Sequence, residues 1–514
     1  MCSIYEQYTT MKFLDCTLRD GGYYTNWNFS SDLVEIYLQT VSKLPISYIE
    51  LGYLSDVRDN NGPFYHLNYN SISFAKKILR KDQKVYAMVN TKEIKNSKQL
   101  ISIIAKTKGS IDGIRFAVDP HKVIKLLKML NPVKKKFPKI SFNINLMYLS
   151  KWHKNLNFSK KILNLLSEKV DVVSIVDSFG SMLPQDIKDF LEKINYKKRN
   201  LGCHFHNNCG LALASTLTAL DNGCNFADST FLGMGRGAGN AETELLLALK
   251  SPKNSKMSSF EINNLLEKLE VLKANLKWGS SFSYAFAARE GYSQSKMMDL
   301  IQKRRLDPSI AVKAIVNSHD NFKKINFINI KNLKKIFKST PLIIGGGPNF
   351  KTFGKLLLKQ LGDKTPLILS GSRALKNFSS LNIKIKNPKI MLLSGNELKK
   401  IRVNNEKNIF QKLNINYFIA EKIFLNNNEV KTLKKIVYSD SVAINPLLLA
   451  GLAILKLKKK QINLAFFDGE FKDDKSKIVM RETQESVKYL EKSGIKFETL
   501  TPSYLNVKEL NPYT

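Results

Sequence analysis

Short runs rich in β-branched and aromatic residues alternate with amphipathic stretches along the first half of the chain. Eight such runs lie between residues 12 and 240, and the gaps between them hold helical patterns such as 32–44 and 122–130. The runs begin near Lys12, Tyr48, Lys84, Gly113, Ile140, Val170, Asn200 and Phe226. Eight strand–helix units in succession predict an α/β fold, a closed (β/α)8 TIM barrel whose chemistry lies at the carboxyl ends of the strands.

The second half of the chain follows a different pattern. Residues 251–338 carry leucines at helical spacing, and from Pro341 a new series of apolar strands alternates with helices. The sequence therefore predicts three parts: a barrel over 11–250, a helical appendix and connector over 251–338, and a second, Rossmann-like α/β domain over 339–514.

Composition agrees with folded domains and adds a strong positive charge. Of the 514 residues, 43% are hydrophobic and 24% are charged, which are values typical of globular proteins. The formal net charge is +37, but only 12 of the 81 basic side chains are arginine, and the lysines are spread over many segments. Proteins that read nucleic acid usually concentrate arginine on one face, so we expect anionic small molecules as partners and no specific nucleic acid.

Cysteine usage and hydropathy bear on the compartment. The five cysteines form no Cys-x-x-Cys pair, which argues against a disulfide framework or a structural zinc site and favours a reducing cytoplasm. The N-terminus has no signal pattern, and the longest apolar stretch, 446–455, is far shorter than the roughly 20 residues of a membrane span. We therefore expect a cytoplasmic protein with no membrane attachment.

Polar side chains gather at the predicted carboxyl ends of the barrel strands. The first strand runs into LDCTLRDGG, which places Arg19 and Asp20 at the barrel mouth, beside two glycines expected to allow a tight turn. The seventh strand ends in GCHFHNN, where His204 and His206 share one face because alternate strand residues point the same way. Two imidazoles and a carboxylate can form a facial triad with open coordination positions, and Asn240 could add an amide oxygen.

Each of these signals is weak when taken singly. An isolated His-x-His pair usually serves ordinary hydrogen bonding, and an isolated Arg–Asp pair means less still. The concentration of polar residues at strand ends, including Glu50, Arg115 and Asp177, is what favours an enzyme. Cys203 and Cys209 flank the histidines, and we interpret them as packing residues rather than ligands.

Four motifs, LDCTLRDGG, VDSFGSMLP, GCHFHNN and GMGRGAGNAETE, occur in this order at the ends of predicted strands. Together they resemble the metal-dependent lyase and aldolase barrels related to 3-hydroxy-3-methylglutaryl-CoA lyase, 4-hydroxy-2-oxovalerate aldolase and isopropylmalate synthase. The resemblance covers roughly residues 11–300. It implies a divalent Mn or Mg ion held by four side chains: Asp20, His204, His206 and Asn240.

The resemblance also implies a reaction. A 2-oxo acid such as pyruvate can chelate the ion, which then acts as a Lewis acid while a bond at the adjacent carbon is made or broken. Arg19 is implied to stabilise the enolate oxygen, and Glu50 and Asp177 to orient the site. The expected enzyme is a carbon–carbon lyase acting on a 2-oxo acid and an aldehyde. Because related barrels often associate through their helical appendices, a homodimer is compatible with the resemblance.

The residues after the first motif depart from these families. The aldolases carry a histidine base at the third position after the motif aspartate, where this chain has Tyr23. Tyr23 or Tyr24 could move a proton only with a lowered pKa or through a water molecule. The acyl-CoA-condensing enzymes carry RDGEQ at this point, which argues against a thioester substrate here. We rank an aldol or retro-aldol reaction first, ahead of an acyl-CoA lyase or synthase, a decarboxylation and a non-catalytic barrel.

The second domain opens with a candidate phosphate site. The segment LIIGGGPNF is a strand followed by Gly345, Gly346 and Gly347 and then by a helical pattern. Glycines let the chain approach a phosphate beside a helix N-terminus, although a plain structural turn is an equal alternative. The later run SVAINPLLLAGLAILKLKKKQINLAFFDGE is loosely similar to Rossmann-like domains of sialyltransferases and flagellin-glycosylating proteins. That similarity implies a bound nucleotide or nucleotide-sugar and a role in carbohydrate biosynthesis, with a sugar-derived aldehyde as substrate.

Overall fold

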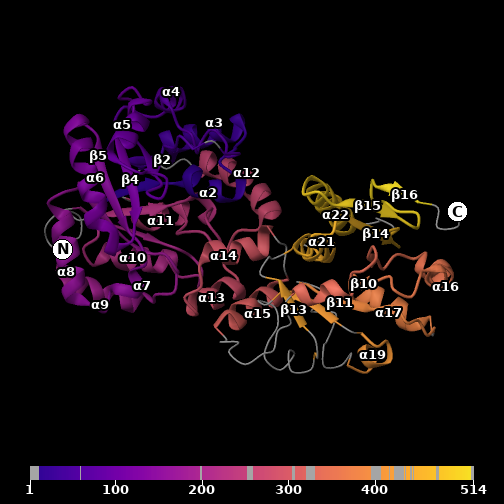
Figure 1. Cartoon of the computed structure of the whole chain (residues 1–514). Helices are drawn as coiled ribbons and strands as arrows, with labels where there is room; N and C mark the ends of the chain where they lie inside the picture. The colour runs from indigo at the N-terminus through magenta and orange to yellow at the C-terminus, as the bar shows by residue number, and fades with distance from the viewer. Residues whose placement is uncertain are drawn as a thin grey trace. The chain divides into compact units, whose positions relative to one another are not determined.

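The computed structural model divides the chain into two compact units, Met1–Met298 and Asp299–Thr514 (Figure 1). It describes residues 11–57, 59–196, 200–251, 259–303, 307–319, 330–381, 383–394, 407–415, 417–421, 433, 436–439, 443, 445–469 and 474–510. The expected three-part division at residues 250 and 338 stays a prediction, and parts of the expected connector lie outside the described residues.

The first unit is a closed barrel of eight parallel strands in sequential order, which confirms the predicted fold. The strands are β1 (Lys12–Asp15), β2 (Tyr48–Tyr53), β3 (Lys84–Val89), β4 (Gly113–Val118), β5 (Ser141–Leu146), β6 (Val172–Asp177), β7 (Asn200–Phe205) and β8 (Phe226–Ser229). The first and last strands pair directly, from Lys12 opposite Phe226 to Asp15 opposite Ser229. The barrel therefore leaves no open edge.

Helices between the strands cover the barrel. They are α2 (Thr17–Thr25), α3 (Ser31–Ser42), α4 (Tyr69–Ile78), α5 (Ser97–Ala105), α6 (Val123–Lys136), α7 (Leu149–Trp152), α8 (Leu156–Ser167), α9 (Pro184–Ile194), α10 (Ala212–Asp221) and α11 (Thr243–Lys250). Several begin at a polar cap, as where the Asn96 side chain accepts a hydrogen bond from the backbone of Gln99.

The two faces of the strands differ in chemistry. On β4, Ile114 and Phe116 pack in the shell of hydrophobic side chains between barrel and helices, so Arg115 between them faces the interior. The amino-terminal end of the interior is filled by an apolar layer that includes Leu14 and Phe226. In the described part of the barrel interior, the buried charged side chains lie above this layer, toward the carboxyl ends, which is where the site is positioned.

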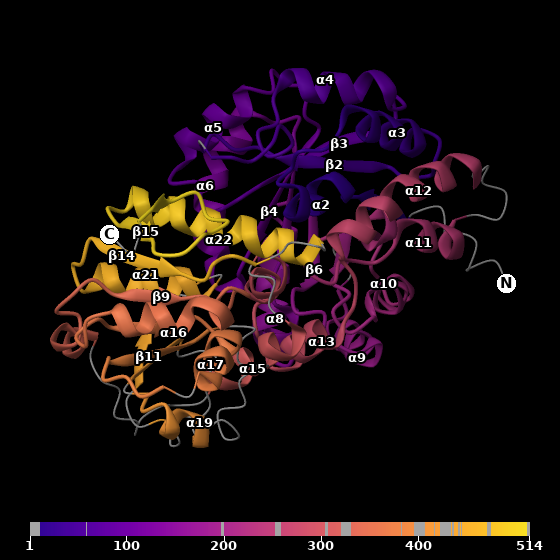
Figure 2. The same cartoon turned by 90° about the vertical axis from the view of Figure 1, so that its right-hand side faces the viewer.

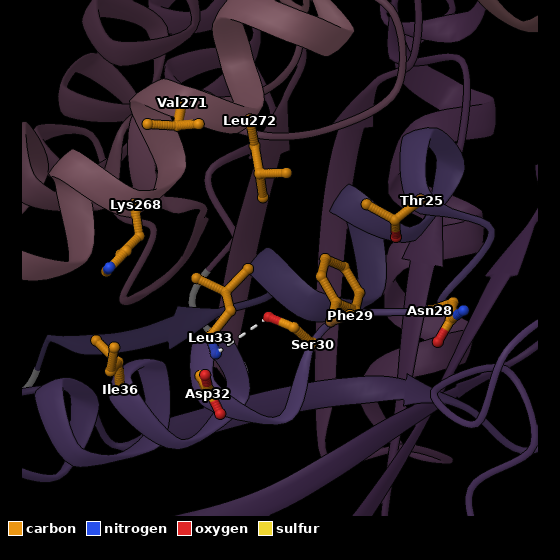
Figure 3. A pocket seen from close by; sticks show the side chains of 10 residues that line it. All are labelled: Thr25, Asn28, Phe29, Ser30, Asp32, Leu33, Ile36, Lys268, Val271 and Leu272. Carbon is orange, nitrogen blue, oxygen red and sulfur yellow. Dashed lines mark hydrogen bonds between the residues drawn. The ribbon is translucent and has the colours of Figure 1, made fainter.

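Further helices follow the barrel: α12 (Ser259–Leu276), α13 (Phe282–Arg289), α14 (Gln294–Met298), a π-helical turn over Asp299–Lys303 and α15 (Pro308–His319). Helix α12 packs against α3, and a groove of about 510 Å³ lies beside them (Figure 3). The groove is lined by Thr25, Asn28, Phe29, Ser30, Asp32, Leu33, Ile36, Lys268, Val271 and Leu272. None of the predicted site residues lines it, so we place the chemistry at the barrel mouth instead.

The second unit contains a second parallel sheet, as predicted, with the order β13-β12-β11-β10-β9-β14-β15-β16. Its strands are β9 (Leu342–Ile344), β10 (Leu367–Leu369), β11 (Lys389–Leu393), β12 (Tyr417–Glu421), β13 (Ile436–Ser439), β14 (Gln461–Ala465), β15 (Lys496–Thr499) and β16 (Lys508–Glu509). The chain order reverses between β9 and β14. This reversal is the topological switch point at which doubly wound sheets bind ligands.

Helices cover both faces of the second sheet (Figures 1 and 2). Helices α16 (Phe350–Gln360) and α17 (Ser372–Ser380) pack together, and α21 (Pro446–Lys456) packs with α22 (Asp474–Lys492). Right-handed crossovers would place these two pairs on opposite faces, because successive strands are added in one direction from β9 to β13 and in the other direction from β14 to β16. Within the described residues, no helix combines the length and apolar character needed to cross a membrane.

Candidate active site

A buried ion pair lies where the first strand meets the first helix. Arg19 and Asp20 are in the first turns of α2, directly after β1, and only 5% and 1% of their surfaces are exposed. Arg19 Nε donates to Glu50 Oε2 at 2.7 Å, and Arg19 Nη1 donates to Asp20 Oδ1 at 2.6 Å. Burial by itself lowers the pKa of Arg19, but the charges of Asp20 and Glu50 raise it well above its usual value. The guanidinium is thus a permanent cation held in one orientation.

The two glycines after this pair act differently from our expectation. Gly21 and Gly22 lie inside α2 rather than in a turn. A Cβ atom on Gly21 would lie 2.7 Å from Met234 Sδ, and one on Gly22 would lie 2.1 Å from the Trp27 ring. The prediction of a tight turn is therefore wrong: the glycines allow the loop after β8 and an indole ring to pack directly on the helix.

A second buried ion pair lies deeper in the barrel, between β4 and β8. Arg115 donates to Asp228 through Nη2 and to Glu50 Oε2 through Nη1 at 3.3 Å. The same Asp228 oxygen lies 3.0 Å from His204 Nδ1. A carboxylate at Nδ1 accepts the ring N–H, so we assign the tautomer in which His204 Nε2 carries a lone pair. That nitrogen faces Asp20, at 3.7 Å from its Oδ2 atom.

The four predicted metal ligands converge at this point. Asn240 Nδ2 donates to Asp20 Oδ2 at 2.6 Å, and His206 pairs with Asn240 through an isolated β-bridge. The rings of His204 and His206 lie nearly perpendicular, with centroids 5.0 Å apart. The structure brings these residues together, and their role as metal ligands stays a prediction.

The protonation states suit metal binding. Burial opposes ionisation of Asp20, but the charges of Arg19 and the histidines outweigh it and lower its pKa to about 2. Burial and the charge of His204 lower the pKa of His206 to about 3. Near neutral pH the carboxylate is therefore ionised and the His206 imidazole is neutral, as metal ligands must be.

The donor atoms can be tested for their fit to a divalent ion. Among the residues that the structure describes, no three His, Cys, Asp or Glu side chains form a cluster spaced as a metal site. However, two buried atoms here lack any hydrogen-bond partner in the described chain: His206 Nδ1 and Asn240 Oδ1. Two ligands about 2.1 Å from one ion are roughly 3 to 4 Å apart, which matches the Asp20–His204 separation. Turning the Asn240 amide over would present its oxygen in place of Nδ2. The set therefore fits an ion by donor type, and the Asp20–His204 pair fits it by spacing as well.

Tyr23 lies in an aromatic cluster beside these residues. Its hydroxyl shares a 2.9 Å hydrogen bond with the hydroxyl of Tyr53, and its ring meets Trp27 edge-on at 4.9 Å. Tyr65 completes the cluster against Trp27 and Tyr53, with ring centroids 4.6 and 4.9 Å away. Arg236 lies over the Tyr23 ring, with Cζ 3.8 Å from the centroid. We call Tyr23, Trp27, Tyr53 and Tyr65 the aromatic wall.

Asp177 borders the ligand set through its backbone, because its carbonyl oxygen accepts the N–H of His206 at 3.5 Å. The Asp177 carboxylate accepts hydrogen bonds from the backbone N–H groups of Phe179 (3.3 Å) and Met182 (2.9 Å), so it holds its own loop rather than contacting Arg19 or Asp20. The three glycines Gly345, Gly346 and Gly347 lie in the second unit, at the switch point after β9. There the N–H of Gly347 donates to the carbonyl of Phe466 at 2.9 Å.

Two residues of the site escaped the sequence analysis. Asp228 sits two residues after Phe226, whose side chain is in the barrel interior, so the two-residue period of β8 could have placed it inside. Arg236 is part of the motif GMGRGAGNAETE, but no periodicity governs a loop, so its direction had no signal in the sequence. Both side chains interact with predicted residues: Asp228 with His204, and Arg236 with Tyr23.

Comparison with known proteins adds a family and several relatives. A family model described as HMGL-like matches residues 10–267. Oxaloacetate decarboxylase of Mycobacterium tuberculosis is 26% identical over 243 residues, covering 46% of this chain and 68% of the relative. A 4-hydroxy-2-oxovalerate aldolase of Thermus thermophilus is 34% identical over 146 residues, covering 28% of this chain and 41% of the relative. The match thus spans less than half the length of that aldolase.

A solved structure is also similar. The N-terminal domain of a candidate aldolase from Bacteroides vulgatus superposes with a TM-score of 0.53 and 32% sequence identity. The match covers 57% of this chain and 96% of that domain. It spans about the length of the barrel and the helices that follow it.

Proposed function

Because the chain belongs to the HMGL-like family, we propose that its first unit is a divalent-metal-dependent carbon–carbon lyase acting next to a 2-oxo acid. Its curated relatives are named for oxaloacetate and for 4-hydroxy-2-oxovalerate. The observation that carries the proposal is the convergence at one barrel mouth of a fixed cation and four donor side chains: Arg19, Asp20, His204, His206 and Asn240.

A divalent ion, when bound, would supply Lewis-acid polarisation of the 2-oxo acid. Two imidazoles in the donor set favour Mn over Mg, because Mg prefers oxygen ligands. Arg19 would stabilise the enolate oxygen through Nη2, the guanidinium group not used in its bonds to Asp20 and Glu50. Glu50 acts as a positioning residue because it holds Arg19 and Arg115 at once. Asp177 would act likewise, by fixing the loop after β6.

Tyr23 is our candidate for the proton-transfer group. Of the two hydroxyls in the Tyr23–Tyr53 hydrogen bond, one donates, so the accepting hydroxyl keeps its own proton for a substrate or a water. We propose that Tyr23 exchanges a proton with the carbon next to the keto group, directly or through one water.

Proton exchange with pyruvate tests this function. We expect the Mn-loaded protein to exchange the methyl protons of pyruvate for deuterium in heavy water, as followed by NMR, and to do so more slowly by about 10²-fold or more in Tyr23→Phe. A screen of aldehydes, sugar aldehydes included, would then identify the second substrate. Absence of exchange in protein that binds Mn would favour the non-catalytic alternative, and release of carbon dioxide from oxaloacetate alone would favour a decarboxylase.

For the second unit we propose a nucleotide or nucleotide-sugar site at the switch point. Gly345–Gly347 follow β9, and Asp468 follows β14, the strand beside it. The Asp468 carboxylate accepts the backbone N–H of Asn349 at 2.9 Å, so it ties the two strand ends together. Ligands of doubly wound sheets bind at this position. Together with the barrel, such a site would support a role in carbohydrate biosynthesis with a sugar-derived aldehyde.

Ligand-induced stabilisation tests the second site. We expect UDP-glucose at concentrations well above its Kd to raise the melting temperature of the second unit. Gly346→Val should abolish the shift, because a Cβ at Gly346 would lie 2.7 Å from the side chain of Arg373 and crowd the loop. Gly362→Val is the matched control, since no atom lies within 4 Å of a Cβ there. A shift that Gly346→Val leaves unchanged, or no shift with any nucleotide, would contradict the proposal.

A further inference from the structure

Arg236 is a cation at the barrel mouth that the reaction proposed above does not use. Its Nε atom is buried and has no hydrogen-bond partner among the described residues, while the side chain as a whole is partly exposed. Within the described part of the chain, no carboxylate lies within ion-pair distance of its guanidinium, unlike those of Arg19 and Arg115. A desolvated guanidinium nitrogen without an acceptor is costly, so its retention calls for an acceptor that the described part of the chain does not provide.

The position of Arg236 is fixed by its surroundings. The loop that carries it packs on the predicted ligands, because a Cβ on the preceding Gly235 would lie 2.3 Å from Asn240 Nδ2. The following residue, Gly237, is held by a 2.7 Å hydrogen bond from the Tyr24 hydroxyl to its carbonyl. The guanidinium stacks on Tyr23, and its charge lowers the pKa of both Asp20 and His206. Arg236 therefore lies between the aromatic wall and the ligand set.

With a divalent ion bound, the net charge at the barrel mouth would match a substrate that carries two negative groups. Three guanidinium groups and three carboxylates meet there: Arg19, Arg115, Arg236, Asp20, Glu50 and Asp228. These charges balance, so a divalent ion bound to neutral histidines would bring the net charge to +2. A 2-oxo acid carries one negative charge at the end that would meet the ion. One positive charge then remains. Of the three guanidinium groups, that of Arg236 has no carboxylate within ion-pair distance among the described residues.

We propose that Arg236 binds a second anionic group of the substrate, a carboxylate or a phosphate, so that the site selects substrates with two acidic groups. This subsite rests on the proposed lyase function of the barrel. A guanidinium presents paired N–H donors that match a carboxylate or phosphate, and stacking on Tyr23 holds it in orientation. The accepting hydroxyl of the Tyr23–Tyr53 pair has a spare proton to add a further hydrogen bond.

Binding measurements with matched probes test the subsite. The Mn-loaded protein is titrated calorimetrically with pyruvate and with 2-oxoglutarate, which adds a second carboxylate, and with glyceraldehyde and its 3-phosphate in the presence of pyruvate. Tighter binding of 2-oxoglutarate would place the second anion on the 2-oxo acid, and tighter binding of the phosphate ester would place it on the aldehyde. For the preferred dianionic probe, we expect Arg236→Gln to raise the Kd by about 10- to 100-fold more than it raises the Kd of pyruvate.

Two further variants control for folding and for surface charge. Arg236→Lys keeps the charge but loses the fork of donors, so its effect should be intermediate. Arg289→Gln removes a guanidinium that is 75% exposed and should leave the ratio of the two Kd values unchanged. If Arg236→Gln lowers the affinity for the dianionic probe and for pyruvate by the same factor, the subsite is overturned. It is also overturned if the variant lowers neither affinity.

The same protein variants and measurements distinguish failure of this inference from failure of the function on which it rests. If the wild-type protein exchanges the protons of pyruvate but Arg236→Gln weakens the dianionic probe and pyruvate equally, the subsite is refuted and the lyase proposal stands. If Arg236→Gln selectively weakens the dianionic probe but the wild-type protein exchanges no pyruvate protons, the lyase proposal is refuted and the barrel is an anion-binding protein.

Discussion

Replacing Asp20 with asparagine should abolish both tight Mn binding and pyruvate proton exchange. The substitution keeps the shape of the side chain but removes the only negative charge among the four predicted ligands. It leaves Arg19 Nη1, now 2.6 Å from Asp20 Oδ1, with a neutral acceptor in place of a charged one. We expect Mn affinity to fall by more than about 100-fold, since even partners behind the ligands change affinity by 10- to 100-fold. The exchange rate should fall by at least about 10³-fold. Metal binding is measured by calorimetry and exchange by NMR.

Asp32→Asn provides the matched control. Asp32 lies in the first turn of α3 with an exposed side chain, so the same chemical change there should affect neither reading. Retention of both Mn affinity and exchange in Asp20→Asn would remove the basis of the metal site. Loss of exchange with full Mn affinity would instead exclude Asp20 as a ligand and restrict it to orienting Arg19.

The largest loss of stability should come from Asp228→Ala. Asp228 is fully buried and accepts hydrogen bonds from Arg115 and His204, so its removal leaves a buried cation with one distant partner at Glu50. Breaking a buried pair in this way costs about 3 to 5 kcal/mol of unfolding free energy. All three tryptophans of the chain lie in the first unit, so their fluorescence during urea unfolding reports on that unit and not on the second.

The pH dependence and a surface control sharpen this prediction. Burial opposes ionisation of Asp228, but the charge of Arg115 and the hydrogen bond with His204 outweigh it and lower its pKa. A lowered pKa means that the stabilisation is full above the unfolded-state value near 4 and is lost as the pH falls through the folded-state value. The difference between wild type and Asp228→Ala should therefore shrink in acid. Asp221→Ala, which removes a 58% exposed partner of Lys250, should cost at most about 1 kcal/mol at any pH.

The sequence was most informative about the barrel, because its signal is repeated. Each strand supplies its own apolar run, and eight such runs in order leave few alternative topologies. The strand order of the second sheet, unlike that of the barrel, could not be predicted from the apolar runs. The return from β13 to β14 across the switch point depends on which strands pair, and no local pattern records that pairing.

The candidate site was predictable only in part, for a related reason. Alternation along β7 places His204 and His206 on one face, and the end of β1 places Asp20 nearby. The partners of these residues come from distant parts of the sequence. Asp228 lies 24 residues from His204, and its salt bridge to Arg115 joins positions 113 residues apart. The role of Asp177 stays a prediction: its carboxylate accepts backbone N–H groups of its own loop, and a position at a strand end does not tell such a residue from one that faces the mouth.

The pairing of β1 with β8 gives the site an order of assembly. Asp20 and Asn240 stand 220 positions apart and are joined by one hydrogen bond across the seam where the ring of strands closes. During synthesis, Asp20 cannot meet Asn240 until nearly the whole barrel has left the ribosome. An ion bound across the seam would fasten the two ends of the ring, so catalysis should emerge only with the final step of folding and should vanish first when the ring opens.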